Sequence, residues 1–285
     1  MARDAHHRPE YADPVGQLKK TYHLEMVSDR QRTGAILRAL RHALNPDTVF
    51  CELGCGTGVF SLFAAQICKK VYAVEIDPKM VEIAGRNFAR SEFSDKIELI
   101  KGNAGELTLP EKADVIFCEM MSVWCVDEPQ IPVFNHAFRE ILKPGGLFLP
   151  TRIINLAELG FFKFNYGGAE MKAAIPLFTG IPRLGGMTER RVCRSLDFST
   201  FLDLDLSCMT EFMSLGSGTI NCAMLTSIVQ IGLRTIFSGS DSLMPQTLVP
   251  LVEPLEVGYG ERLQFQAAVK PRMDLNEADF SISRL

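Results

Sequence analysis

Strand-like apolar runs alternate with helix-like segments across residues 48–150, and this alternation constrains the fold more than any other feature. The expected strands are TVFCEL, VYAVEI, IELIKG and ADVIFC, at residues 48–53, 71–76, 97–102 and 113–118. The expected helices cover residues 59–68, 78–90 and 133–142, and KPGG closes the last of them before the apolar run LFLP. Alternation between periods of 2 and 3.6 residues predicts an α/β fold with a doubly wound parallel sheet.

The pattern changes on either side of this region. Residues 1–16 are expected to form a flexible tail, and one or two helices are expected within residues 17–42. After Pro150 the chain consists of short runs rich in Thr, Val, Ile and Phe, separated by Gly and Pro. We therefore predict an α/β domain at residues 17–150 and a mostly antiparallel β domain at residues 151–285.

Composition argues against several classes of protein. The chain has 285 residues, of which 47% are hydrophobic and 22% charged, so it can bury a full core. No apolar run reaches the roughly 20 residues that span a bilayer, and the polar start MARDAHHRPE does not resemble a secretory signal, so a cytoplasmic protein without membrane partners is expected. A net charge of −4 offers no basic surface for nucleic acid. The eight cysteines form no C-x-x-C pair, so we expect no disulfides and no metal site.

A glycine-rich turn, ELGCGTG at residues 52–58, follows the first expected strand and opens a helix. Dinucleotide sites use G-x-G-x-x-G, whereas Gly54, Gly56 and Gly58 have the shorter G-x-G-x-G spacing, which indicates a cofactor without a pyrophosphate. Glu75 ends the next strand, where an acidic side chain can accept hydrogen bonds from both ribose hydroxyls. Glu52 can face an ammonium group. This combination favours S-adenosylmethionine.

Two carboxylates, Glu119 and Glu128, lie nine residues apart in EMMSVWCVDE, directly after the strand ADVIFC. A sulfonium cofactor and a cationic acceptor about 4 Å apart repel each other by roughly 4 kcal/mol at an effective dielectric constant of 20. Paired carboxylates would offset that repulsion. The plainer interpretation, two solvated loop acids, stays open.

The stretch HLEMVSDRQRT at residues 23–33 resembles the segment that protein arginine methyltransferases place over their cofactor. The motifs ELGCGTG and VYAVEID and the two spaced glutamates then follow in that family's order, and residues 252–282 resemble the closing strands of its β-barrel. The resemblance covers about residues 20–285. It implies a class I methyltransferase domain followed by an antiparallel β-barrel.

The resemblance also implies roles for individual residues. Arg32 would hold the cofactor carboxylate, Glu52 its amino group and Glu75 its ribose. Met26 would pack near the sulfonium, His23 could contact the cofactor or only cap local structure, and adenine would meet Gly105 or Glu106. Glu119 and Glu128 would clasp the acceptor guanidinium with support from Asp29, although Asp29 and Arg32 could equally be a helix-surface ion pair.

Several positions depart from the family pattern. Gln17 stands where the family has a tyrosine near the cofactor, and Met120, Ser122 and Val123 replace its Trp and its Gly-Tyr pair. Residues 242–244, Ser-Leu-Met, replace a Thr-His-Trp loop. These changes reshape the acceptor pocket and leave its charges intact. Trp124 lines the entrance or is simply buried, and burial is slightly favoured.

The resemblance implies methyl transfer to a guanidino nitrogen of arginine, in a protein or as free arginine or another small guanidine. Transfer to a different amine or a hydroxyl, and an inactive cofactor-binding partner, are the alternatives. In this family a segment leaving the barrel reaches a second subunit. Residues 169–187 occupy that place, with Ile175, Leu177, Phe178 and Ile181 available to bury, so a homodimer is expected.

Overall fold

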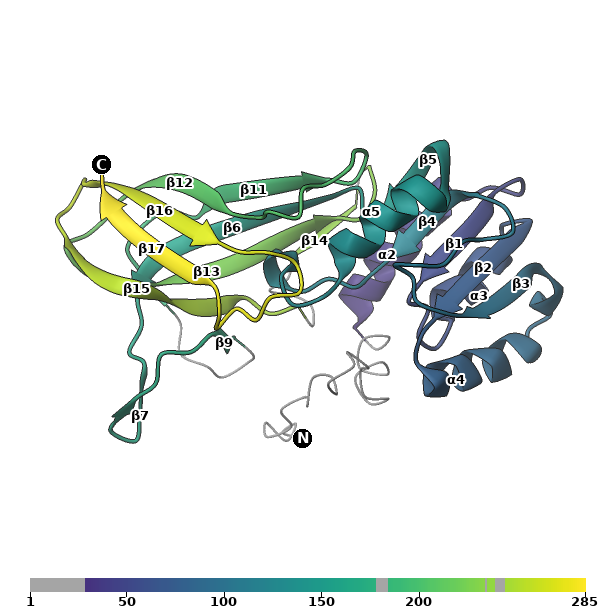
Figure 1. The fold of residues 1–285 in the computed structure, drawn as a ribbon, viewed down its shortest axis with the longest axis horizontal. Coiled ribbons are helices and arrows are strands. Elements are labelled where there is room, and N and C mark those ends of the chain that lie inside the picture. Colours follow the sequence, from purple (N-terminus) through teal and green to yellow (C-terminus); the bar gives the residue numbers. More distant parts are fainter. Residues whose placement is uncertain (1–28, 178–183, 234, 239–243) are drawn as a thin grey trace.

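A computed structural model describes residues 29–177, 184–233, 235–238 and 244–285. A parallel sheet flanked by helices lies at one end of the molecule, and antiparallel strands extend from it toward the other end (Figure 1). This arrangement confirms the predicted order of an α/β half followed by a β half.

The parallel sheet has five strands in the order β3-β2-β1-β4-β5. Its strands are β1 (Val49–Leu53), β2 (Lys70–Glu75), β3 (Ile97–Lys101), β4 (Ala113–Cys118) and β5 (Leu142–Leu149). The chain runs outward from β1 to β3 and then returns to place β4 on the other side of β1, so the order reverses between β1 and β4. In open α/β sheets ligands bind outside the carboxyl ends of the strands at this point.

Four α-helices accompany the sheet in the described part of the chain: α2 (Arg30–Ala43), α3 (Val59–Ala65), α4 (Pro78–Ala89) and α5 (Gln130–Glu140). Single-turn 3₁₀ helices η1 (Ser94–Lys96) and η2 (Val123–Cys125) lie in two of the connections. Asp29 caps α2 and Asp77 caps α4, since their carboxylates accept hydrogen bonds from the backbone N–H groups of Arg32 (3.0 Å) and Lys79 (2.7 Å).

Several predicted boundaries differ from the structure; the helix expected to reach Cys68, for example, ends at Ala65. The helix α5 begins at Gln130, not Val133, because Pro132 falls in its first turn, where no intrahelical N–H is needed. The predicted KPGG stop lies inside β5. Because β5 is an edge strand, its Pro144 disrupts no second ladder, and an irregularity in the β4–β5 register accommodates the extra residues.

The C-terminal half consists of antiparallel sheets that curl into part of a barrel (Figure 1). The larger sheet is centred on β6 (Arg152–Phe161), β13 (Gly218–Gln230) and β15 (Thr247–Val257). Its remaining strands are β9 (Ile175–Pro176), β10 (Gly185–Gly186), β11 (Arg191–Asp197) and β14 (Ile236–Ser238). The smaller sheet contains β12 (Cys208–Met213), β16 (Arg262–Ala268) and β17 (Asp279–Arg284), and β7 (Asn165–Tyr166) pairs with β8 (Ala169–Glu170) in a separate hairpin.

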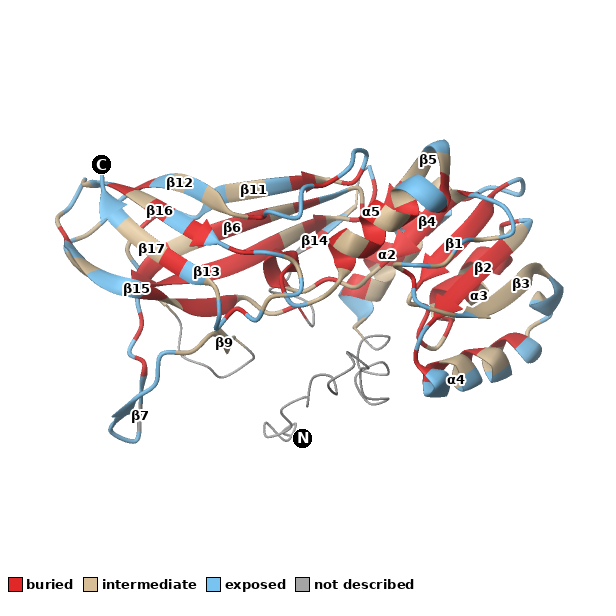
Figure 2. Ribbon diagram, viewed as in Figure 1, coloured by how far each residue is buried: buried red, intermediate tan, exposed pale blue. Residues whose placement is uncertain are grey.

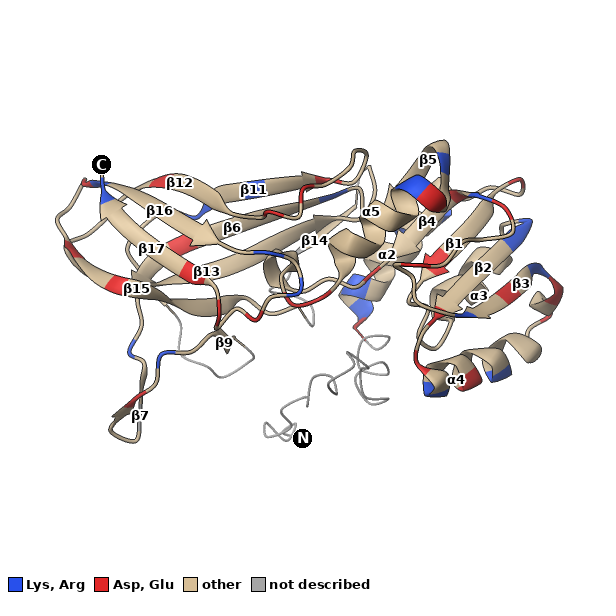
Figure 3. Ribbon diagram, viewed as in Figure 1, with Lys and Arg blue, Asp and Glu red and all other residues tan. Residues whose placement is uncertain are grey.

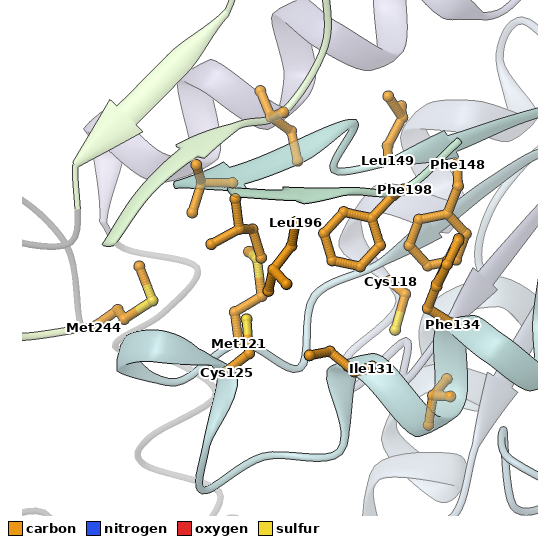
Figure 4. Close-up of a cluster of buried hydrophobic side chains, with 14 of the residues drawn as sticks. Cys118, Met121, Cys125, Ile131, Phe134, Phe148, Leu149, Leu196, Phe198 and Met244 are labelled. Atoms are coloured by element: carbon orange, nitrogen blue, oxygen red, sulfur yellow. The ribbon is translucent and has the colours of Figure 1, made fainter. Parts of the chain in front are cut away.

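One hydrophobic core runs through both halves, and Figure 2 shows buried residues continuing from the parallel sheet into the long antiparallel strands. At the junction Phe134 of α5 lies with its ring centroid 4.7 Å from Phe148 of β5 and 4.8 Å from Phe198 beyond β11 (Figure 4). Met121 and Cys125, from the segment between β4 and α5, enter the same core. The segment that carries both predicted acceptor glutamates is therefore anchored where the two halves meet.

All eight cysteines are free, and six of them are buried. None of the helices in the described ranges combines the length and the apolar character needed to cross a lipid bilayer.

Candidate active site

The glycine turn, residues 54–58, leaves the end of β1 with left-handed backbone at Gly54, Gly56 and Gly58 (φ 77°, 53° and 81°). The N–H groups of Gly54 and Cys55 both donate to the carbonyl of Val74 at 2.9 Å, which ties the turn to β2. A Cβ at Gly58 would overlap the ring of Phe88, and a Cβ at Gly54 would overlap the methyl group of Met120. The left-handed backbone favours glycine at both positions, the ring of Phe88 also restricts the space at Gly58, and Met120 lies directly against the turn.

Glu75 stabilises the turn from the end of β2. One carboxylate oxygen accepts a hydrogen bond from the N–H of Gly56 at 2.7 Å, and the other accepts from Ile76 (2.8 Å) and Asp77 (2.9 Å). The side chain is buried. Because two carboxylate oxygens offer about four lone-pair positions, Glu75 keeps capacity for a further hydroxyl donor.

Glu52, at the end of β1, is a buried carboxyl group that accepts a hydrogen bond from the Ser61 hydroxyl. Removal from water raises its pKa to about 8; the bonds from Ser61 oppose this rise, and the charge of Glu75 adds to it. A cation that binds beside such a buried carboxyl group favours its charged form, so the cation and the ionised carboxylate stabilise each other. This chemistry fits the ammonium group of an amino acid.

The turn after β3 contains the two candidates for an adenine contact. Glu75 is in register with Lys101, so the residues that follow Lys101 emerge beside Glu75 at the same edge of the sheet. Gly105 N–H donates to the Asn103 side chain at 3.0 Å, and Glu106 N–H donates to the Asn103 carbonyl at 3.0 Å. Gly105 is half-buried and Glu106 is exposed, and this geometry does not choose between them.

Glu119 follows β4 directly and forms an ion pair with the guanidinium of Arg32 from α2. Both side chains are largely buried, at 6% exposure for Arg32 and 14% for Glu119. Asp29 does not pair with the Arg32 guanidinium among these contacts; it caps α2 through the Arg32 backbone and so fixes the first turn, from which Arg32 extends to Glu119.

Glu128 ends the double-glutamate loop, which we define as residues 119–128. The Ser122 hydroxyl accepts hydrogen bonds from the N–H groups of Asp127 (2.9 Å) and Glu128 (3.3 Å), which closes the loop on itself. Removal from water raises the pKa of Glu128 to about 7, Asp127 adds to the rise, and the charge of Arg32 opposes it. The Arg32 guanidinium therefore forms an ion pair with Glu119 and also lowers the pKa of Glu128 through its charge.

Trp124 anchors the middle of this loop to the β half. It is 1% exposed and has positive φ (58°), which a non-glycine residue adopts only when its surroundings impose it. Its backbone N–H donates to Ser227 Oγ at 2.8 Å, and its indole N–H donates to the Leu156 carbonyl at 3.0 Å. Asn155 donates to the Trp124 carbonyl at 3.2 Å. The buried interpretation of Trp124 is confirmed.

Comparisons with known proteins agree with this geometry. Residues 50–146 match a family described as a methyltransferase domain. The chain is 34% identical over 134 residues to protein arginine N-methyltransferase 1 of Chlamydomonas reinhardtii (46% of this chain, 39% of that one). It is 32% identical over 146 residues to an uncharacterised protein of Methanocaldococcus jannaschii (51% of this chain, 56% of that one). The matched region thus spans less than three-fifths of either relative's length.

Solved structures extend the likeness of the fold to the β half. A chain of the Trypanosoma brucei PRMT1 enzyme–prozyme heterotetrameric complex with AdoHcy superposes with a TM-score of 0.78 at 22% identity, covering 93% of both chains. Arabidopsis thaliana protein arginine methyltransferase 10 gives a TM-score of 0.73 at 18% identity, covering 88% of both. Residues 50–146 thus match a methyltransferase domain, and the fold of the whole chain is similar to that of protein arginine methyltransferases.

The described residues fit S-adenosylmethionine, the cofactor that the glycine turn, Glu52 and Glu75 predict. The glycine turn has the left-handed backbone typical of a tight ligand-binding turn, Glu75 keeps acceptor capacity for one ribose hydroxyl, and the buried Glu52 carboxyl would be stabilised in its charged form by a cation. Acidic positions, red in Figure 3, occur on β1 and in the connection from β4 to α5, on both sides of the point where the strand order reverses. This distribution suits a positively charged sulfonium.

Some predicted positions lie outside the described residues: His23, Met26, Gln17, Ser242, Leu243, Phe178 and Ile181. Met244 is described and is buried in the main core. Sequence reasoning missed Ser227, Asn155 and Gln130, which hold the double-glutamate loop. Their only sequence signal is a polar residue within or beside an apolar run, which is too common to identify a contact with a distant loop.

Proposed function

We propose that this chain transfers the methyl group of S-adenosylmethionine to a guanidino nitrogen of arginine, in a protein or in a small guanidine. The observation that carries the proposal is the Arg32 guanidinium, which lies against Glu119 while its charge also acts on Glu128. The double-glutamate loop thus accommodates a guanidinium group. Met120 of the same loop lies against Gly54, so the loop lies beside the cofactor turn.

The chemistry of the acceptor explains why two carboxylates are useful. A guanidinium has a pKa above 12 and is not deprotonated before reaction, so the enzyme must make a cationic group nucleophilic. Carboxylates bonded to its N–H groups orient the plane and concentrate electron density on one nitrogen. That nitrogen would attack the sulfonium methyl carbon, the C–S bond would break to release S-adenosylhomocysteine, and the proton would pass to a carboxylate during or after transfer. Positioning supplies most of the rate.

We propose that Arg32 holds the cofactor carboxylate as well as Glu119, while Glu52 receives the ammonium, Glu75 the ribose and Gly105 or Glu106 the adenine. His23 and Met26 complete the proposed cofactor site. Arg32 would then connect the cofactor to Glu119, and Asp29 would fix Arg32 through the helix cap.

A labelled-methyl assay tests the proposal. The acceptors are arginine-containing peptides, matched peptides with Lys for each Arg, free arginine, small guanidines and amine metabolites. We expect label in the arginine or guanidine acceptors and none in the lysine peptides. Label in lysine or hydroxyl acceptors would favour the second enzyme class. Tight binding of S-adenosylhomocysteine without any transfer would favour an inactive binding partner.

We also propose a two-fold homodimer formed through residues 169–187. The β7–β8 hairpin extends away from the main sheets (Figure 1), and Met171 beyond it is 53% exposed. Ile175 and Leu177 pack partly against the chain's own cluster around Phe162 and Leu248. Sedimentation equilibrium at micromolar concentration should show a dimer, and a monomer under those conditions would contradict the proposal.

A further inference from the structure

The side-chain amide of Gln130 bonds to the backbone on both sides of Glu119. Gln130 is the first residue of α5 and is 0% exposed. Its Oε1 accepts a hydrogen bond from the Met120 N–H at 2.8 Å, and its Nε2 donates to the Cys118 carbonyl at 3.1 Å. The two peptide groups that flank the Glu119 Cα are therefore held by a single planar amide.

These two hydrogen bonds extend the backbone pairing of β4 beyond the end of the sheet. The pairing between β1 and β4 ends at Leu53 and Cys118, and the pairing between β4 and β5 ends at Phe117 and Leu149. Glu119 thus emerges one residue beyond the last sheet hydrogen bonds. A donor and an acceptor supplied together by Gln130 continue the ladder by one step and fix the direction in which the Glu119 side chain leaves the backbone.

Gln130 also lies two residues after Glu128 in the chain. Residues 128–130 therefore carry Glu128 and also hydrogen-bond to the backbone on both sides of Glu119. The distance and orientation between the two carboxylates depend on this segment. Arg32 contacts the Glu119 side chain and Gln130 holds its backbone. Catalytic groups lose rate sharply when their position shifts by about 1 Å.

We propose that Gln130 is a positioning residue that sets Glu119 against Glu128 for guanidinium binding and methyl transfer. The proposal rests on the proposed function. It assigns a catalytic consequence to a buried amide that could otherwise serve stability alone.

The helix α5 offers a matched control. Asn135 is also buried, and its amide makes the same pair of bonds to another loop: it accepts from the Leu202 N–H at 2.9 Å and donates to the Leu202 carbonyl at 2.7 Å. Gln130→Met and Asn135→Leu therefore each remove two buried hydrogen bonds from α5 to backbone groups, and Gln130→Met also removes the weaker bond that the Cys118 thiol donates to Gln130 Oε1 at 3.7 Å. Of these two α5 residues, Gln130 bonds to the double-glutamate loop and Asn135 bonds to Leu202.

The experiment compares both variants with the wild-type protein. For Gln130→Met we expect kcat for an arginine-type acceptor to fall at least tenfold, with S-adenosylhomocysteine affinity within threefold and faster hydrogen exchange at the Met120 amide. Asn135→Leu should keep kcat within threefold. In a Glu119→Gln background, Gln130→Met should lower kcat by less than threefold, because the group it positions is already impaired. If Gln130→Met does not fold, Gln130→Glu is measured in its place, because it keeps an acceptor for the Met120 N–H and removes only the donor to the Cys118 carbonyl.

Each failure has its own signature. Unchanged kcat in Gln130→Met, or an equal loss in Asn135→Leu, overturns the positioning role while the proposed function stands. Unchanged exchange at Met120 overturns the backbone contact itself. A wild-type protein that transfers no methyl to any guanidine overturns the proposed function, and the positioning role falls with it.

Discussion

The two halves of the candidate site are built in different ways. The cofactor turn is held by nearby parts of the chain: Gly56 bonds to Glu75 across 19 residues, and Gly58 N–H bonds to the Cys55 carbonyl at 2.8 Å. The double-glutamate loop depends on distant partners, with 87 residues between Arg32 and Glu119 and 103 between Trp124 and Ser227. The first arrangement follows from one β–α–β unit, whereas the second requires both halves of the fold to be assembled.

Because the cofactor turn and the double-glutamate loop are held by different contacts, cofactor binding and the choice of acceptor can change independently. Substitutions in β6 or β13 can move the double-glutamate loop through Asn155 and Ser227 without touching the glycine turn. Met120 brings the loop into contact with that turn at Gly54. A methyltransferase fold can therefore keep its cofactor while its acceptor pocket diverges, as the replaced family residues in this chain suggest.

The largest expected effect comes from removing one charge in the loop. Glu119→Gln and Glu128→Gln each preserve shape, so S-adenosylhomocysteine affinity should stay within about threefold. Methyl transfer should fall by about 100-fold or more, which corresponds to roughly 2.7 kcal/mol of transition-state stabilisation. Isothermal titration and single-turnover transfer measure the two quantities separately.

The double variant sharpens this test. Since one remaining carboxylate cannot orient the guanidinium plane, the two losses should be similar in size and far from additive. Unchanged turnover in Glu128→Gln beside abolished turnover in Glu119→Gln would contradict the paired clasp and favour a single-base mechanism on another nucleophile.

The same contrast explains what the sequence could predict. The glycine turn and Glu75 follow a strand–turn–helix pattern whose consequences lie within a few tens of residues, and the structure places them together at one sheet edge. By contrast, the bonds of Trp124 to Ser227 and of Gln130 to Cys118 depend on side-chain packing between separate elements, which no periodicity encodes. The prediction of a turn at KPGG was wrong because Pro and Gly signal a turn unless the strand is known to be an edge.

The second prediction concerns the local half. Glu75→Ala removes the acceptor for three backbone N–H groups as well as the proposed ribose contact. Hydrogen bonds to a charged acceptor contribute about 1.5 to 3 kcal/mol, so S-adenosylhomocysteine affinity should fall roughly 10- to 100-fold. Glu75→Gln keeps one carbonyl acceptor and should lose less. Undiminished binding to Glu75→Ala would remove Glu75 from the cofactor site.

The third prediction compares two glycines with nearly the same backbone. Gly58 (φ 81°) faces Phe88, whereas at Gly145 (φ 76°) the space that an alanine methyl group would occupy is open to 4 Å. Alanine costs about 1 to 2 kcal/mol at either site for the left-handed backbone. Overpacking against Phe88 should add about 1 to 3 kcal/mol at Gly58 alone. Urea denaturation measures the difference, and equal destabilisation by the two variants would show that Phe88 moves aside freely.

The smallest expected effect is a pH dependence that belongs to the acceptor half. Glu128 must be ionised to receive a guanidinium, and its pKa of about 7 in the free protein means that the ionised fraction grows as pH rises through 7. At low cofactor concentration, kcat/KM reports the groups of the free enzyme and should rise about tenfold between pH 6 and pH 8. Asp127, whose pKa is raised to about 6 by burial and by Asp274, and Glu52, with a pKa of about 8, also titrate nearby.

Glu128→Gln identifies the source, because its residual kcat/KM should lose the limb near pH 7. Asp127→Asn should move the limb to lower pH, because it removes a charge that raises the pKa of Glu128. Persistence of the limb in Glu128→Gln would assign it to Glu52 and the cofactor half.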